Sequence, residues 1–405
     1  METLPSLSLK LRSLTLFRSL LKEPVLCSFC QLLGKLEQPE SFSQADAYCA
    51  FVSQLYAAGG NWSQHLLDTA LEDENPYVRL KVQGKPIPPY MEDSLERELT
   101  LLQHAAQVTS EEILSKMACG LSLPVWETSP VCFLQVYRER MEQLSSHGFG
   151  IFARCHVFTL DEQGRLIPVT HPDPQTLVSL TGYEPQRQKL LVNTQALVDG
   201  LPANNILLYG DAGTGKSSVV KALANEFAPQ GLRLIEVKKT QLRHIPALME
   251  NLSDNPLKFL LFIDDLSFSP NDAGFTSLKA ILEGSVCARP KNMVVYATSN
   301  RRHLVRETFS DRMGDDLHLS DTLEEVSSLS ARFGLTITFS KPDKELYCFI
   351  IQELANEYGL KTPLPQLLVQ AEAHAIRSGG RSPRTARQFV EFMKATENAQ
   401  EKSSC

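Results

Sequence analysis

The N-terminal third of the chain carries apolar residues at the spacing of α-helices. One such set recurs every three or four positions and consists of Leu95, Leu99, Leu102 and Ala106. A second set at similar spacing consists of Leu14, Phe17, Leu20 and Leu21. The proline-rich stretch 86–89 interrupts the pattern. We therefore predict an α-helical N-terminal domain over residues 1–147, broken in two by these prolines.

The periodicity changes to a strand-like alternation after this region. Ile151–Leu160 and Arg165–Val169 alternate between apolar and polar positions, and Asp161–Gly164 between them has the composition of a hairpin turn. The prolines of His171–Pro174 are typical of a linker. We expect a β-hairpin and linker over residues 148–175.

From residue 176 apolar runs of strand length alternate with helical patterns. The expected strands are Ile206–Tyr209, Leu232–Val237, Phe259–Ile263 and Met293–Thr298. A helix is expected at Ser217–Phe227, between the first two strands. Such alternation implies a parallel sheet covered by helices. The predicted fold class is therefore α/β, with its core over residues 176–341.

The last part of the chain returns to helical patterns only. The expected helices are Lys344–Tyr358, Leu364–Ser378 and Pro383–Thr396. They predict a small helical domain over residues 342–397. A flexible tail is expected over residues 398–405.

Composition and charge narrow the class of protein. The chain is 43% hydrophobic and 21% charged, which is ordinary for a globular protein, and its net charge of −7 gives no global attraction to nucleic acid. No apolar run is long enough to span a membrane, and the N-terminus lacks the features of a signal peptide. The nine cysteines are odd in number and have no framework spacing. We expect a cytoplasmic protein without a disulfide framework or a membrane partner.

A glycine-rich motif follows the strand Ile206–Tyr209 and opens the helix Ser217–Phe227. It consists of Gly210, Asp211, Ala212, Gly213, Thr214, Gly215, Lys216 and Ser217, followed by Ser218. This is a complete Walker A motif in the structural context that it requires. Its glycines let successive backbone N–H groups face phosphates, and the helix N-terminus adds the positive end of its dipole. We predict that Lys216 binds the β- and γ-phosphates of ATP and that the Ser217 hydroxyl binds Mg²⁺.

An apolar run ending in two acids follows Walker A at the distance expected of a Walker B motif. The run Phe259–Ile263 is a buried central strand, and Asp264 and Asp265 emerge at its carboxyl end, where open α/β sheets bind their ligands. We expect Asp264 to hold the Mg²⁺ shell and Asp265 to polarise the attacking water.

The next strand also ends in a polar side chain. Asn300 follows Thr298 and Ser299 at the end of the run Met293–Thr298. An amide there can orient the water between Asp265 and the γ-phosphate, which is the sensor-1 role. The basic residues Arg301, Arg302 and His303 follow directly. These three residues have two interpretations, to which we give equal weight. They form a solvated loop, or they contact phosphates or another subunit.

These motifs together resemble those of AAA+ ATPases. The Asp-Asp form of Walker B and the stretch Leu329–Leu335 are similar to those of replication initiators and helicase loaders. The sequence also resembles a bacterial family catalogued as domain of unknown function 815. The residues that carry this second resemblance are Leu180–Glu184, Pro202–Asn205, Asp264–Phe268 and Ala297–Leu304. The resemblance implies an AAA+ core with a helical lid, which is the role expected for residues 342–397.

The resemblance to AAA+ ATPases implies further site residues. Arg332 matches the arginine finger, which acts on ATP bound by a neighbouring subunit and so implies a homo-oligomer. Arg384 matches the sensor-2 arginine of the lid, with Arg387 and Arg381 as alternatives. Gly182 and Tyr183 match residues that flank the adenine, although for the tyrosine a place in the core is the favoured interpretation.

Three hypotheses about function follow. The first is an oligomeric ATPase that remodels or loads an unknown partner chosen by the N-terminal domain. The second is a nucleotide-dependent switch that hydrolyses ATP slowly. The third is a loader-type ATPase acting on nucleic acid through the basic cluster Lys238, Lys239, Arg243 and His244. This segment lacks the aromatic-apolar-Gly triplet that the AAA+ resemblance associates with threading of polypeptides, which disfavours that activity.

Overall fold

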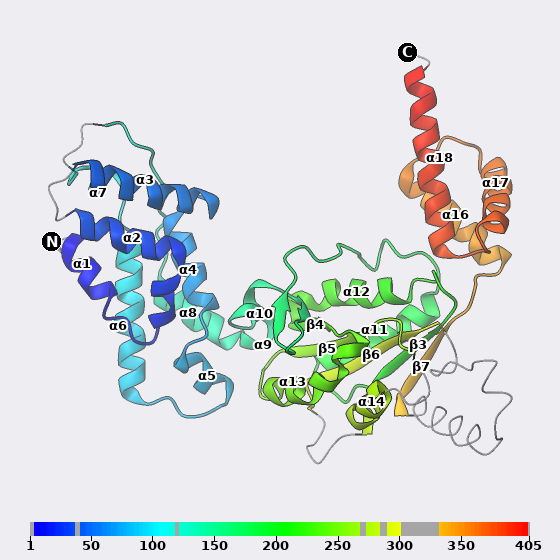
Figure 1. Ribbon diagram of the computed structural model, residues 1–405, viewed down its shortest axis with the longest axis horizontal. Coiled ribbons are helices and arrows are strands. Elements are labelled where there is room, and N and C mark those ends of the chain that lie inside the picture. Colours follow the sequence, from blue (N-terminus) through cyan, green and yellow to red (C-terminus); the bar gives the residue numbers. More distant parts are fainter. Residues whose placement is uncertain are drawn as a thin grey trace. The chain divides into compact units, whose positions relative to one another are not determined.

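The computed structural model describes residues 4–36, 41–117, 121–267, 273–283, 290–300 and 332–403. The chain divides into two compact units, Met1–Arg154 and Cys155–Cys405, which we describe separately (Figure 1). In the described part of the chain, none of the helices combines the length and apolar content that crossing a membrane requires.

The first unit is built from helices. In chain order they are α1 (Leu4–Leu11), the 3-10 helix η1 (Arg18–Lys22), α2 (Pro24–Lys35), α3 (Ser41–Ala57), α4 (Trp62–Glu72), α5 (Pro76–Val82), α6 (Pro89–Ala106), α7 (Ser110–Leu114), α8 (Phe133–Glu142), α9 (Leu144–His147) and α10 (Ile151–Arg154). Side chains cap several N-termini. Asn61 accepts from the backbone N–H of Gln64, and Thr109 and Glu112 form a capping box at α7.

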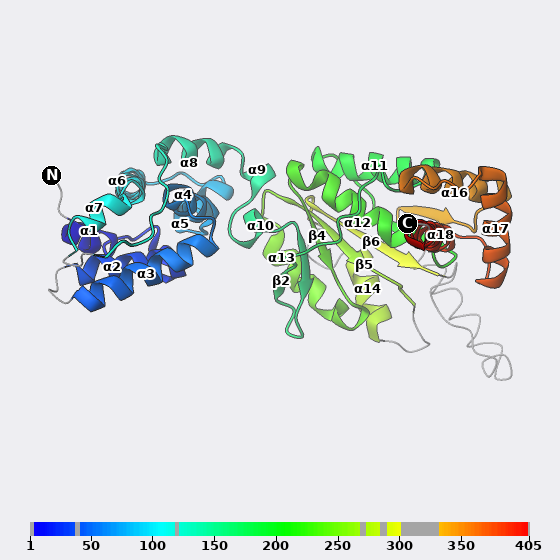
Figure 2. The same ribbon diagram turned by 90° about the horizontal axis from the view of Figure 1, so that it is seen from above.

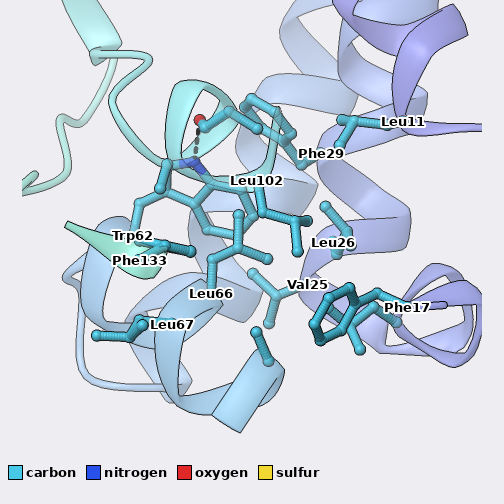
Figure 3. Packing of buried hydrophobic residues seen from close by; sticks show 14 of the residues in the cluster. Leu11, Phe17, Val25, Leu26, Phe29, Trp62, Leu66, Leu67, Leu102 and Phe133 are labelled. Carbon is cyan, nitrogen blue, oxygen red and sulfur yellow. Dashed lines mark hydrogen bonds between the residues drawn. The ribbon is translucent and has the colours of Figure 1, made fainter. Parts of the chain in front are cut away.

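The core of this unit is centred on Trp62, whose side chain is fully buried. Its ring centroid lies 4.7 Å from that of Phe29 and 5.3 Å from that of Phe51. Its indole N–H donates to the carbonyl oxygen of Ala105 at 2.8 Å, so the buried polar atom is satisfied. Figure 3 shows side chains of several helices converging around it. The apolar set predicted on α6 is buried as expected.

The second unit contains a seven-stranded sheet in the order β2-β1-β4-β5-β6-β3-β7. Its strands are β1 (Val157–Leu160), β2 (Leu166–Pro168), β3 (Ile206–Gly210), β4 (Leu232–Glu236), β5 (Lys258–Ile263), β6 (Met293–Ser299) and β7 (Leu335–Phe339). All neighbouring strands are parallel except β1 and β2, which form an antiparallel hairpin. The predicted parallel sheet is confirmed.

Helices cover both faces of the sheet (Figure 1). They are α11 (Glu184–Val198), α12 (Lys216–Phe227), the 3-10 helices η2 (Ala228–Gln230) and η3 (Lys239–His244), α13 (Ile245–Leu252) and α14 (Ala273–Glu283). α11 and α12 share one buried cluster with alternate residues of the strands, including Leu260 and Phe262 of β5. Because both faces are covered, β5 is buried along almost its whole length, which explains its uninterrupted apolar sequence.

Three further helices form the lid: α16 (Lys344–Tyr358), α17 (Leu364–Arg377) and α18 (Pro383–Ser403). They enclose a small core of their own, which includes Ile351, Leu367 and Val390 (Figure 2). The helical lid expected from the sequence is present. α18 continues to Ser403, however, so a helix occupies most of the stretch 398–405 where we expected a flexible tail.

Two other expectations differ from the structure. Ile151–Arg154 forms the short helix α10, and strand β1 begins only at Val157, so the predicted strand Ile151–Leu160 is wrong in its first half. The hairpin is also not a separate element: β1 pairs with β4 and extends the core sheet. The division between the units accordingly follows Arg154 and not residue 147. Around Leu14–Leu21 the chain forms only turns and η1, where helical spacing predicted an α-helix.

Candidate functional site

The Walker A loop connects β3 to α12, as predicted. Three of its glycines, Gly210, Gly213 and Gly215, have positive φ angles of 137°, 77° and 92°. L-residues with a Cβ rarely adopt such angles, so these positions need glycine. The Thr214 hydroxyl donates to the Asp211 carbonyl at 2.8 Å and closes the turn. The loop therefore curls around the N-terminus of α12.

Lys216 is the first residue of α12, and its side chain is almost fully buried inside this curl. The ammonium group donates to the carbonyl oxygens of Gly210 and Asp211 at 2.9 and 2.7 Å, and to Asn300 Oδ1 at 3.1 Å. Burial lowers the pKa of Lys216, while the neighbouring Asp211, Asp264 and Asp265 act to raise it. Lys216 thus places a buried cation at the centre of the loop.

The two Walker B acids lie beside Lys216 and Ser217. Asp264 Oδ1 accepts hydrogen bonds from the Ser217 hydroxyl at 2.6 Å and from the Thr298 hydroxyl at 2.5 Å. The backbone N–H of Asp265 donates to Thr298 Oγ1 at 2.8 Å. Thr298 therefore links both acids, a role that our sequence analysis missed. The available signal was its place at the carboxyl end of β6, two residues before Asn300, where open α/β sheets bind their ligands.

Asn300 connects the acid to the lysine. Its Nδ2 donates to Asp265 Oδ1 at 2.8 Å, and its Oδ1 accepts from the Lys216 ammonium. Asp265 has a left-handed backbone with a φ of 51°. In the described residues only Asp265 and Tyr183 combine a side chain with a positive φ, and both line the same cavity. Such strain is characteristic of functional sites.

These residues line a cavity of about 420 Å³. Its polar lining includes the Walker A loop, Asp264, Asp265 and Asn300. Its apolar lining includes Leu180, Val219, Ile350 and Leu354. Sequence analysis did not identify any of these four apolar residues, because they come from separate elements and carry no motif.

Gly182 and Tyr183 also line the cavity, but Tyr183 is mainly a core residue. Its ring centroid lies 5.3 Å from that of Phe339, and its hydroxyl donates to the Ser340 carbonyl at 2.7 Å. Gly182 lets the lid approach closely, since a Cβ at this position would lie 3.2 Å from Leu346 Cδ1 and 3.3 Å from Ile350 Cδ1.

The three lid arginines differ in their positions. Arg384 and Arg387 line the cavity, and Arg384 donates its backbone N–H to the Gly213 carbonyl at 3.2 Å. Arg381 instead pairs with Glu372, with Nε 3.0 Å from Oε1. Arg387 donates from Nη2 to the Ser179 carbonyl at 3.2 Å.

Arg332 lies just before Phe333 and β7 and is not one of the residues that line the cavity of its own chain. Arg301, Arg302 and His303 lie outside the described residues, as does the stretch Leu329–Ala331. Both interpretations of Arg301, Arg302 and His303 therefore stay predictions.

One known protein family matches this chain. The family model described as "Protein of unknown function (DUF815)" matches residues 153–397, which is more than half of the chain. The chain belongs to this family. The resemblance found from the sequence motifs is thus confirmed, and the match covers the whole α/β core and most of the lid. No curated protein matches the chain.

Solved structures that are similar to part of this chain include RuvB and DnaA. A variant of Thermotoga maritima RuvB is 19% identical with a TM-score of 0.37, and the match covers 54% of this chain and 63% of that one. AMPPCP-bound DnaA from Aquifex aeolicus is 19% identical with a TM-score of 0.39, and the match covers 57% and 70%. The chain thus spans less than two thirds of the RuvB chain. The structure of this DUF815 member confirms the expected α/β fold, a mostly parallel sheet covered by helices and followed by a helical lid.

Proposed function

We propose that this DUF815 protein binds ATP with Mg²⁺ in the cavity and hydrolyses it to ADP and phosphate. The observation that supports this most strongly is the continuous network of Lys216, Asn300 and Asp265 beside the Ser217–Asp264 pair. Phosphoryl transfer requires little covalent chemistry from a protein, so a fixed set of charges and hydrogen-bond donors around the phosphates is sufficient.

The Walker A loop would bind the phosphates. Its backbone N–H groups and the N-terminus of α12 favour an anion, and Lys216 supplies a full positive charge. The ammonium of Lys216 donates to two neutral carbonyl oxygens. Phosphate oxygens are charged acceptors and form stronger hydrogen bonds with an ammonium group. Binding of the nucleotide would therefore replace weaker partners of Lys216 with stronger ones.

The donor set beside the loop suits Mg²⁺. The Ser217 hydroxyl and the Asp264 carboxylate are oxygen ligands, and they already lie 2.6 Å apart. Mg²⁺ is usually held by one or two such groups together with water and substrate phosphates. Ser217 and Asp264 would hold the ion, whose charge stabilises the negative charge on the phosphates.

Asp265 would accept a hydrogen bond from the attacking water. Thr298 and Asn300 hold this acid by its backbone N–H and by its carboxylate, so its position is determined from two sides. Asn300 is close enough to both Asp265 and Lys216 to orient water between them. The same two contacts would keep the Asp265 carboxylate at the phosphate end of the cavity.

Two arginines would complete the site. Arg384 lines the cavity and would contact the γ-phosphate from the lid, as sensor 2. Arg332 does not line the cavity of its own chain, which is the position required of a finger that acts on a neighbour. We therefore propose a homo-oligomer in which hydrolysis depends on assembly. The energy would serve to remodel or load a partner.

A slow nucleotide switch is the second candidate function. Asp265 is shorter than the glutamate usual in AAA+ proteins and is held in a left-handed backbone. A shorter carboxylate on a constrained backbone has less reach toward a water molecule beside the γ-phosphate. This favours slow hydrolysis. A nucleic-acid partner would use the exposed Lys238 and Arg243, which follow β4. Stimulation by DNA that is lost on reversing these charges would support that partner.

Lys216→Ala is expected to weaken ATP binding roughly 100-fold, because one charge-assisted contact to two phosphates is lost. Titration of purified protein with a fluorescent ATP analogue measures this. Lys189→Ala, which changes an exposed lysine on α11, is the matched control and should bind as the wild type. Equal affinity of wild type and Lys216→Ala would contradict nucleotide binding in this cavity.

Arg332→Ala is expected to abolish ATP hydrolysis while ATP binding is kept. If the finger acts on a neighbour, mixing Arg332→Ala with Lys216→Ala restores part of the activity, since one variant supplies the nucleotide and the other the arginine. The measurement is the steady-state ATPase rate of each variant and of the mixture over a range of concentrations. A wild-type rate per molecule that is low and independent of concentration would support the slow switch instead.

A further inference from the structure

Residues Asp173–Gly182, here called the strap, lead from the hairpin to α11 without forming a helix or strand. Five residues of the strap line the cavity: Gln175, Ser179, Leu180, Thr181 and Gly182. The Walker A loop would bind the phosphates, so we assign the strap to the part of the cavity that would receive the base and ribose. Backbone groups of such a segment need partners from elsewhere in the protein.

The first anchor of the strap comes from α12. Asn225 Nδ2 donates to the carbonyl oxygens of Asp173 and Gln175, both at 2.8 Å. Asn225 Oδ1 in turn lies 2.9 Å from His156 Nε2. The start of the strap is thus held by the helix that follows the Walker A loop.

The second anchor is Arg187 of α11. Its Nη1 donates to the Leu177 carbonyl at 3.0 Å and also to the Leu180 carbonyl. Its Nη2 pairs with Glu184 Oε1 at 2.9 Å. Both anchors belong to the α/β core and not to the lid.

The third anchor is Arg387, and it comes from the lid. Its Nη2 donates to the Ser179 carbonyl at 3.2 Å, and Ser179 lines the cavity. Arg384 lies one turn earlier on α18 and contacts the Walker A loop through its backbone N–H. The two arginines therefore contact two different segments of the cavity lining from one helix, the Walker A loop and the strap.

We propose that Arg387 is a positioning residue that couples the lid to the strap, and through it to the base end of the nucleotide site. In this assignment Arg384 senses the phosphates, whereas Arg387 holds the strap against the nucleotide when the lid is docked. This inference rests on the proposed binding of ATP. It also favours Arg384 over Arg387 as sensor 2, because the Arg387 guanidinium binds the backbone carbonyl of Ser179 in the strap.

The affinities for ATP and for ADP distinguish the role proposed for Arg387 from that of Arg384. An arginine that contacts the γ-phosphate favours ATP over ADP, whereas one that acts through the strap affects both nucleotides equally. Isothermal titration of ATP and of ADP into the full-length chain is the measurement. Arg387→Ala is expected to weaken both by the same factor of about ten. Arg384→Ala is expected to weaken ATP much more than ADP.

Two further variants control the experiment. Arg381→Ala removes the lid arginine that pairs with Glu372 and should leave both affinities unchanged. Arg387→Lys keeps a donor for the Ser179 carbonyl and should recover part of the lost affinity. Loss of affinity for ATP alone in Arg387→Ala, or no loss for either nucleotide, would overturn the assignment. Failure of the wild type to bind either nucleotide would instead refute the proposed function.

Discussion

Gly210→Ala is expected to destabilise the unit Cys155–Cys405 by more than about 4 kcal/mol, because the added methyl group has no space. A Cβ at Gly210 would lie 2.1 Å from the carbonyl oxygen of Phe339. Gly210 and Phe339 are paired in the parallel ladder of β3 and β7, so the clash is between two backbones and no side-chain rotation relieves it. The strands would have to separate at the point where the Walker A loop begins.

The two tryptophans of the chain make it possible to assign the loss of stability to one of the two units. Trp62 and Trp126 both belong to the first unit, so tryptophan fluorescence reports on that unit alone. During urea unfolding we expect circular dichroism of Gly210→Ala to show an early transition, with the fluorescence transition unchanged.

Gly359→Ala is the matched control, since Gly359 has a φ of 60° but open space where a Cβ would lie. It should cost only about 1 kcal/mol. Equal costs for the two variants would show that backbone strain dominates and not the clash.

Glu98→Ala is expected to destabilise the first unit by about 3–5 kcal/mol. Glu98 lies on the apolar face of α6 and is only 2% exposed. Its carboxylate accepts from the backbone N–H groups of Thr15, Leu16 and Phe17 at 3.0, 3.0 and 3.1 Å, and from the Thr15 hydroxyl at 2.5 Å. Removing it leaves three backbone donors without their acceptor in the interior.

Tryptophan fluorescence during urea unfolding measures this loss directly. Glu96→Ala, two positions earlier on the same helix, is the control. Glu96 pairs with Arg138, and both side chains are 52% exposed, so its loss should cost less than about 1 kcal/mol. A small effect of Glu98→Ala, similar to that of the control, would mean that water reaches the three N–H groups and replaces the carboxylate.

The expected strands of the α/β core were recognisable because burial on both faces leaves apolar runs. β5 and β6 are apolar along nearly their whole lengths, and the structure confirms their positions within one or two residues. The lid helices were equally clear, and α16 has the predicted bounds. Our sequence analysis did not single out Glu98. A carboxylate on the apolar face of a helix indicates that hydrogen-bond donors are buried beside it.

The hairpin shows where local patterns were insufficient. Ile151–Arg154 forms a turn of helix although its pattern continues into β1. β1 becomes part of the main sheet because β4 offers it an edge. Strand pairing of this kind depends on which edges are free in the folded protein and not on the sequence of the strand itself.

The sequence by itself identified the polar residues of the cavity to which we assign phosphate and Mg²⁺ binding. Lys216, Ser217, Asp264, Asp265 and Asn300 lie at the ends of strands or the start of a helix, and parallel strands bring those ends to one edge. Only the tertiary structure decided the rest. Thr298, Arg187 and Arg387 act through contacts between elements distant in the sequence, such as the bond from Arg387 to Ser179. A motif records residues close along the chain, whereas these contacts exist only once the core, the strap and the lid have packed together.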